Sequence, residues 1–134
     1  FFNNYYGQPV FTPSSNQNYY HIKQLEVWKT TTGLPDISKE RKGNAFIDLP
    51  GVQQGEAYDP TYRDTLTTTV NGRNEIGVRF TMLTPNSDYT YNEYAGFINF
   101  KTNIQKNEAV AVAYRIEGPT NSPDDDIFYG DFQD

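Results

Sequence analysis

Apolar residues recur at every second position in several short runs of this chain, and this period most constrains its fold. Residues 110–116 alternate valine, tyrosine and isoleucine with Ala111, Ala113 and an arginine, and residues 76–82 follow the same pattern. Successive side chains of a β-strand point to opposite faces, so a period of two indicates strands with one buried face. The small Ala111 and Ala113 would leave room for a close neighbour on the second face.

The composition also favours β structure. The hydrophobic share is 36%, while aromatics reach 16%, with 11 Tyr, 9 Phe and one Trp. Tyrosine, phenylalanine, threonine and valine favour strands, whereas the helix formers leucine, alanine and methionine are few. At 134 residues the chain is long enough for one hydrophobic core. We expect residues 1–18 to be an extended N-terminal strap or linker and residues 19–134 to be a single β-rich domain.

Residues 20–30 predict a central strand. Leu25 and Val27 would lie on one face, and Ile22 and Trp28 on the other. Because both faces carry apolar groups, we expect this strand to be covered on both sides.

Turn signals separate the remaining segments. Gly33, Pro35 and a charged run predict a long loop over residues 31–44, followed by a short strand over 45–49. Asp59-Pro60 resembles a helix N-cap with proline in the first turn, so one short helix is allowed within residues 53–69. The other expected elements are a strand at 76–82 after the Asn71-Gly72 turn, a hairpin of 88–91 and 97–101 that turns at Gly96, a strand at 110–116 and an edge strand at 127–132.

These elements predict a mainly β fold. We expect an antiparallel β-sandwich or packed β-sheet of about six to seven short strands with at most one short helix. The residues expected in the core are Trp28, Phe80, Tyr89, Ile98, Phe100, Val112 and Tyr114.

Charge and composition argue against several partners. The net charge is −6 and no lysine or arginine cluster is present, which argues against nucleic acid and anionic lipid. No run approaches the roughly 20 apolar residues of a membrane helix, so we expect a soluble chain without direct membrane insertion. Residues 1–6 do not resemble a signal peptide, and no initiator methionine is present, so we expect an excised fragment or processed product.

Residues that could carry chemistry are few, and we expect no enzyme and no cofactor. The absence of cysteine removes disulfides, thiolate-bound zinc and thiol catalysis, and His21 is the only histidine. A hydrogen-bonded role at a strand start is the expectation for His21. A glycosidase-like carboxylate pair remains possible, since Asp48, Glu56, Asp59 and Asp64 could meet in space, but their spacing in the sequence does not require it.

The acidic run near the C-terminal end is the one weak metal candidate. Asp124, Asp125 and Asp126 could offer hard oxygen ligands to calcium, but the spacing of an EF-hand loop is absent. The default expectation is a solvated turn without a metal.

Exposed tyrosines leave a second kind of function open. A surface carbohydrate- or ligand-binding module would use aromatic rings as a stacking platform. The candidate platform residues are Tyr5, Tyr6, Tyr19, Tyr20, Tyr58 and Tyr62.

Two stretches of the chain are similar to known sequences in the order of their residues, and not only in composition. Residues 22–30 (IKQLEVWKT) and 41–49 (RKGNAFIDL) are similar to consecutive strands of SprA-type proteins. The second stretch comprises residues 88–100 (DYTYNEYAGFINF), 107–114 (NEAVAVAY) and 129–132 (YGDF), which match SprA-like segments in the same order. Asp131 stands where the family usually has glutamate. Together, the segments resemble the SprA/Sov family over roughly residues 20–134.

The resemblance implies a function for the chain. SprA/Sov proteins are outer-membrane translocons of the type IX secretion system of Bacteroidetes, linked in some members to gliding motility. We therefore expect a non-enzymatic structural and interaction domain at the periplasmic or extracellular face of the outer membrane of a Gram-negative bacterium. The expected partners are other translocon subunits, the rest of the same large chain, and secreted cargo proteins.

Overall fold

A computed structural model describes residues 21–31, 38–62, 67–70, 73–76 and 78–133 of the chain. The expected N-terminal strap therefore lies outside the described residues. The strands are β1 (Ile22–Thr30), β2 (Glu40–Gly43), β3 (Val52–Gln53), β4 (Thr67–Val70), β5 (Arg73–Ile76), β6 (Val78–Met82), β7 (Tyr89–Asn92), β8 (Phe97–Phe100), β9 (Val110–Ile116) and β10 (Ile127–Tyr129).

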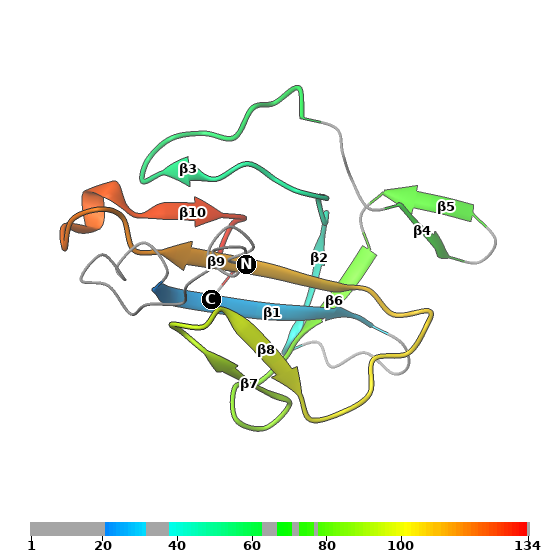
Figure 1. Ribbon diagram of the computed structural model, residues 1–134. Coiled ribbons are helices and arrows are strands. Elements are labelled where there is room, and N and C mark those ends of the chain that lie inside the picture. Colours follow the sequence, from blue (N-terminus) through cyan, green and yellow to red (C-terminus); the bar gives the residue numbers. More distant parts are fainter. Residues whose placement is uncertain (1–20, 32–37, 63–66, 71–72, 77, 134) are drawn as a thin grey trace, which may run out of the picture.

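Six of these strands form one sheet in the order β2-β6-β1-β9-β10-β3 (Figure 1). Every pair of neighbouring strands in the sheet is antiparallel. Two separate hairpins, β4–β5 and β7–β8, complete the described strands. The only helical element among the described residues is a short 3-10 turn, Pro123–Asp125. The prediction of a mainly β, antiparallel fold is confirmed.

Strand β1 organises the sheet. It pairs with β9 from Ile22 to Lys29 and with β6 at its C-terminal end. On the edge away from β9, the N–H of Ile22 donates to the carbonyl of Glu93, and the carbonyl of Val27 accepts from Leu83. The β7–β8 hairpin thus flanks β1 on this side, as Figure 1 shows. The predicted central position of this strand is confirmed.

The pairing register defines the two faces of the sheet. Trp28 lies opposite both Ala111 and Met82, so these three residues share one face. Val27 lies opposite Val112 on the other face. Ala113 does receive a close neighbour, because a Cβ added to Gly130 would lie 3.4 Å from the Cβ of Ala113.

One face assignment from the sequence is wrong. A register shift between Ile22 and Gln24 changes the alternation at the start of β1. Ile22 therefore packs with Leu25, Tyr114 and Ile116 instead of sharing the face of Trp28. Such a bulge inserts one residue into one strand only, which an alternating pattern does not reveal.

The core contains three of the seven residues expected from the sequence. Trp28, Phe80 and Tyr89 are buried. The remaining expected residues, Ile98, Phe100, Val112 and Tyr114, are partly buried. The sequence interpretation missed Ile22, Val27 and Ala113, which are buried.

The predicted long loop over 31–44 is wrong in its C-terminal part. Residues 40–43 form β2, which pairs with β6. This charged strand joins the sheet because the side chain of Glu40, 2% exposed, forms an ion pair with Arg79 of β6. The charges that suggested a loop thus include a buried carboxylate, whose partner Arg79 is 70% exposed.

The predicted strand over 45–49 is also wrong. Its backbone bends instead, and Asp48 adopts a φ of 50°, which a continuous strand does not allow. The short helix within residues 53–69 is not present among the described residues. Asp59 accepts hydrogen bonds from the N–H and hydroxyl of Thr61, and its carbonyl accepts from Tyr62, so the chain makes a single turn.

Two further strand predictions need correction. The strand expected at 76–82 is divided between β5 and β6, which belong to different sheets. The strand expected at the edge, β10, pairs with both β9 and β3 and ends at Tyr129, before Gly130 with its φ of 81°. The hairpin of β7 and β8 is confirmed, with Gly96 at a φ of 70°.

We predict that Ile22→Ala lowers the free energy of unfolding by about 2–5 kcal/mol, because it leaves a cavity in a fully buried position. The matched control is Val110→Ala on β9, where the side chain is 36% exposed and the expected loss is about 0.5 kcal/mol. Urea unfolding of both variants measures the difference. Equal losses would contradict the assignment of Ile22 to the core.

Candidate functional site

A cavity of about 840 Å³ lies against the sheet face that carries Trp28. Among the described residues, its lining comes from β1, β6 and β9 of the sheet and from segments 41–62 and 130–133. Its large apolar side chains are Trp28, Phe46, Leu49, Tyr58, Tyr62 and Phe80. We call this space the aromatic cavity.

Hydrogen bonds hold the aromatic wall in place. The hydroxyl of Tyr58 donates to the carbonyl of Phe128 at 3.3 Å, which ties segment 44–62 to β10. Burial raises the pKa of Tyr58, so this hydroxyl keeps its proton and remains a donor at neutral pH. The ring of Tyr62 lies 5.9 Å from that of Phe46, and its hydroxyl donates to the carbonyl of Ile47.

Glu26 is a polar anchor that links two residues of the cavity lining, Trp28 and Gln133. This buried carboxylate accepts a hydrogen bond from the Nε1 of Trp28 at 3.2 Å and another from the backbone N–H of Gln133 at 3.0 Å. The first bond fixes the indole on the sheet, and the second fixes the C-terminal segment above it. A buried carboxylate needs such donors to offset its loss of hydration.

The described polar residues that line the cavity carry balanced charge. Arg41 and Lys42 contribute two positive groups, and Asp59 and Asp131 contribute two negative groups. Asn44 and Gln133 add neutral amides. An apolar space with a few polar groups at its margin is suited to binding a small molecule.

The structure separates the carboxylates that sequence analysis grouped. Only Asp59 among the described members lines the aromatic cavity. Glu56 accepts a hydrogen bond from the backbone of Gln53, and Asp48 is exposed. Asp64 lies outside the described residues. Of the tyrosines proposed as a platform, Tyr58 and Tyr62 line the cavity, whereas Tyr5, Tyr6, Tyr19 and Tyr20 lie outside the described residues.

Several residues of the cavity were not anticipated from the sequence, among them Phe46, Lys42, Asn44 and Asp131. They come from β2, from the segment after it and from the turn after β10, and no local pattern joins these segments. Besides the candidate residues Tyr58, Asp59 and Tyr62, the small Ala111 and Ala113 were a signal for this site, since they mark the strand face over which the cavity lies.

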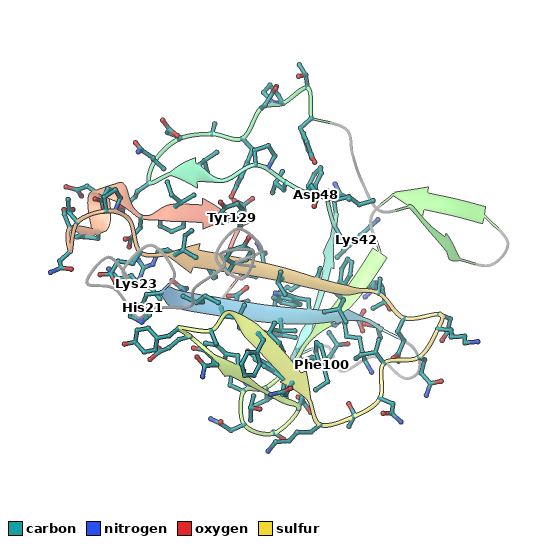
Figure 2. All side chains as sticks on the ribbon, viewed as in Figure 1. His21, Lys23, Lys42, Asp48, Phe100 and Tyr129 are labelled. Atoms are coloured by element: carbon teal, nitrogen blue, oxygen red, sulfur yellow. The ribbon has the colours of Figure 1, made fainter. Side chains whose placement is uncertain are left out.

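His21 belongs to a different cluster at the start of β1. Its Nδ1 donates to the carboxylate of Glu117 at 2.9 Å, and its Nε2 lies 3.5 Å from Glu93. The ring stacks on Tyr94 at a centroid distance of 4.6 Å. Figure 2 shows His21 and Lys23 at one end of β1, well apart from Lys42.

Burial increases along the acidic run, in which Asp124 is exposed and Asp125 is partly buried. Asp126 is fully buried, and its carboxylate lies 3.5 Å from Lys23 and 3.6 Å from Arg115. The side chain of Asp125 accepts two hydrogen bonds from Thr120. The expectation of a solvated turn is therefore wrong for Asp126. Two cations already face this carboxylate, and the described residues contain no cluster of three or more metal-ligating side chains.

Position 118, just before this turn, has no room for a side chain larger than that of glycine. A Cβ added at Gly118 would meet the carbonyl oxygen of Asp125. The N–H of Gly118 also donates to the carboxylate of Asp126 at 3.2 Å. The acidic turn thus closes tightly against the end of β9.

In the described part of the chain, no helix has the length and apolarity needed to cross a membrane. Comparison of the chain with models of protein families, with curated proteins and with solved structures gave no match.

We predict that Glu117→Gln makes the free energy of unfolding less dependent on pH. The hydrogen bond from His21, followed by that from Lys23, holds the pKa of Glu117 below its ordinary value. The stabilisation is therefore fully present above the unfolded glutamate pKa of roughly 4.3 and is lost as pH falls through the lower folded pKa. Urea unfolding between neutral and strongly acidic pH measures this loss.

The control for this prediction is Glu93→Gln, which alters the more distant contact of the same histidine, with a carboxylate that is 47% exposed. We expect a smaller change for that variant, because exposed ion pairs contribute little. An unchanged acid dependence in Glu117→Gln would show that the His21 contact does not stabilise the fold.

Proposed function

We propose that this chain is a non-enzymatic interaction module of an SprA-type outer-membrane translocon, active in type IX protein secretion and gliding motility. The observation that carries the proposal is the position of the segments that resemble this family. The segments 22–30, 88–100 and 107–114 fall on β1, on the β7–β8 hairpin and on β9, in chain order. The segments 41–49 and 129–132 share only residues 41–43 with β2 and Tyr129 with β10. A resemblance that follows the strands of one fold has more weight than scattered similar residues.

Exposed aromatic residues support an interaction role. Six large hydrophobic residues among those described are at least 36% exposed, and three of them, Tyr91, Tyr94 and Phe97, lie on or between β7 and β8. Tyr94 is 56% exposed and Phe97 is 46% exposed. Aromatic side chains are enriched where proteins bind one another, because they bury a large area with little loss of conformational entropy.

The proposed partners are the rest of the same large chain, other translocon subunits and secreted cargo. The proposed location is the periplasmic or extracellular face of the outer membrane. The negative net charge supports a protein partner over nucleic acid or anionic lipid.

The test is affinity capture from envelope extracts of a type IX-secreting bacterium, with the purified chain as bait and mass spectrometry as readout. We expect enrichment of outer-membrane translocon subunits or secreted cargo. The matched control is a bait with Tyr94→Ala and Phe97→Ala, which should weaken capture roughly 30-fold or more if one of these residues is a hot spot.

Circular dichroism of both baits shows whether the substitutions preserve the fold. Equal recovery of translocon subunits by both baits would contradict the role of the hairpin. Failure of the unaltered chain to enrich any subunit or cargo protein would contradict the proposed function itself.

A further inference from the structure

We propose that the aromatic cavity binds a neutral pyranose unit of a glycan. In this assignment the aromatic side chains form the stacking floor, and Lys42, Asn44 and Asp131 bind the sugar hydroxyls. The inference rests on the geometry of the cavity and does not depend on the translocon proposal.

The floor suits the apolar side of a sugar ring. Phe46, 40% exposed, and the partly buried Tyr62 come from the covering segment and offer the accessible ring surface. The buried Trp28 and Phe80 of the sheet add to the apolar lining. The faces of aromatic rings carry negative charge, and the C–H groups on one side of a pyranose carry partial positive charge. Stacking of the two surfaces excludes water and stabilises the complex.

Three polar side chains at the cavity are open to a ligand. Within the described part of the chain, the side chains of Lys42, Asn44 and Asp131 form no hydrogen bond or ion pair. By contrast, Arg41 donates to the carbonyl of Glu40, and Asp59 accepts from Thr61. Lysine donates, aspartate accepts and asparagine does both, which together match the hydroxyl groups of a sugar.

The charge of the lining favours a neutral ligand. Arg41 and Lys42 balance Asp59 and Asp131, although the whole chain carries a net charge of −6. A strongly charged ligand would leave part of this set unpaired near an apolar surface, at a cost in free energy. The volume of about 840 Å³ falls within the range of cavities that hold small ligands.

An extended peptide is less well matched to this site. Peptides that add to a sheet need an accessible strand edge. The outer strand at the cavity is β2, whose sequence ERKG has three charged residues, and charges at an edge oppose strand addition.

Trp28 provides a direct readout, because it is the only tryptophan of the chain and lines the cavity. The experiment titrates the chain with a panel of neutral oligosaccharides, namely maltotriose, cellotriose, xylotriose and mannotriose, while tryptophan fluorescence is recorded. Sialyllactose and an apolar tripeptide serve as charged and peptide probes. We expect a saturable change in fluorescence with at least one neutral oligosaccharide.

Two cavity variants test the residue assignment. Asn44→Ala and Asp131→Ala should each weaken binding about tenfold, since each removes one hydrogen bond to the ligand. Val110→Ala, at an exposed site of β9 outside the cavity, should bind as the unaltered chain does. Thermal unfolding checks each variant, and Phe46→Ala replaces either polar variant that does not fold.

Three results would overturn the proposal. The first is the absence of any response to the neutral oligosaccharides, and the second is a response that both polar variants leave unchanged. The third is a response to the peptide or to sialyllactose alone.

Discussion

The pairing of β1 along both of its edges is the constraint on which the rest of the structure depends. This strand holds β9 on one side, and β6 and the β7–β8 hairpin on the other. It also contributes to both faces of the sheet, with Val27 on one and Trp28 on the other. Loss of its register would therefore displace the core and the cavity together, because a shift of one residue exchanges the two faces.

Glu26 of the same strand connects the sheet to the candidate site. Its carboxylate accepts from the indole of Trp28 and from the backbone of Gln133, so the sheet face and the C-terminal segment of the cavity share one anchor. The second anchor is Tyr58, which ties the covering segment to β10. The cavity is thus shaped by long-range hydrogen bonds to the sheet. Its wall combines segments that are distant in sequence. Because each anchor holds a whole segment of the wall, a change in one anchor would affect several lining residues.

The sequence predicted the features that local patterns determine. The alternation in β9, the central position of β1 and the turn at Gly96 follow from side-chain period and backbone preference. The errors arose where tertiary contacts override those patterns. Glu40 joins a strand through an ion pair with Arg79, and a bulge moves Ile22 to the other face. The cavity could not be predicted, because Lys42, Asn44 and Asp131 meet only after the sheet has formed.

Native-state hydrogen exchange tests the central role of β1 most directly. The account predicts that backbone amides of β1 bonded to β9 exchange most slowly, with an opening free energy equal to that of global unfolding. Amides of the edge strands β2 and β3 should exchange faster through local opening, since each pairs with a described strand on one side only. Exchange of the β1 amides at the rate of β2 or β3 would contradict the claim that β1 holds the structure together.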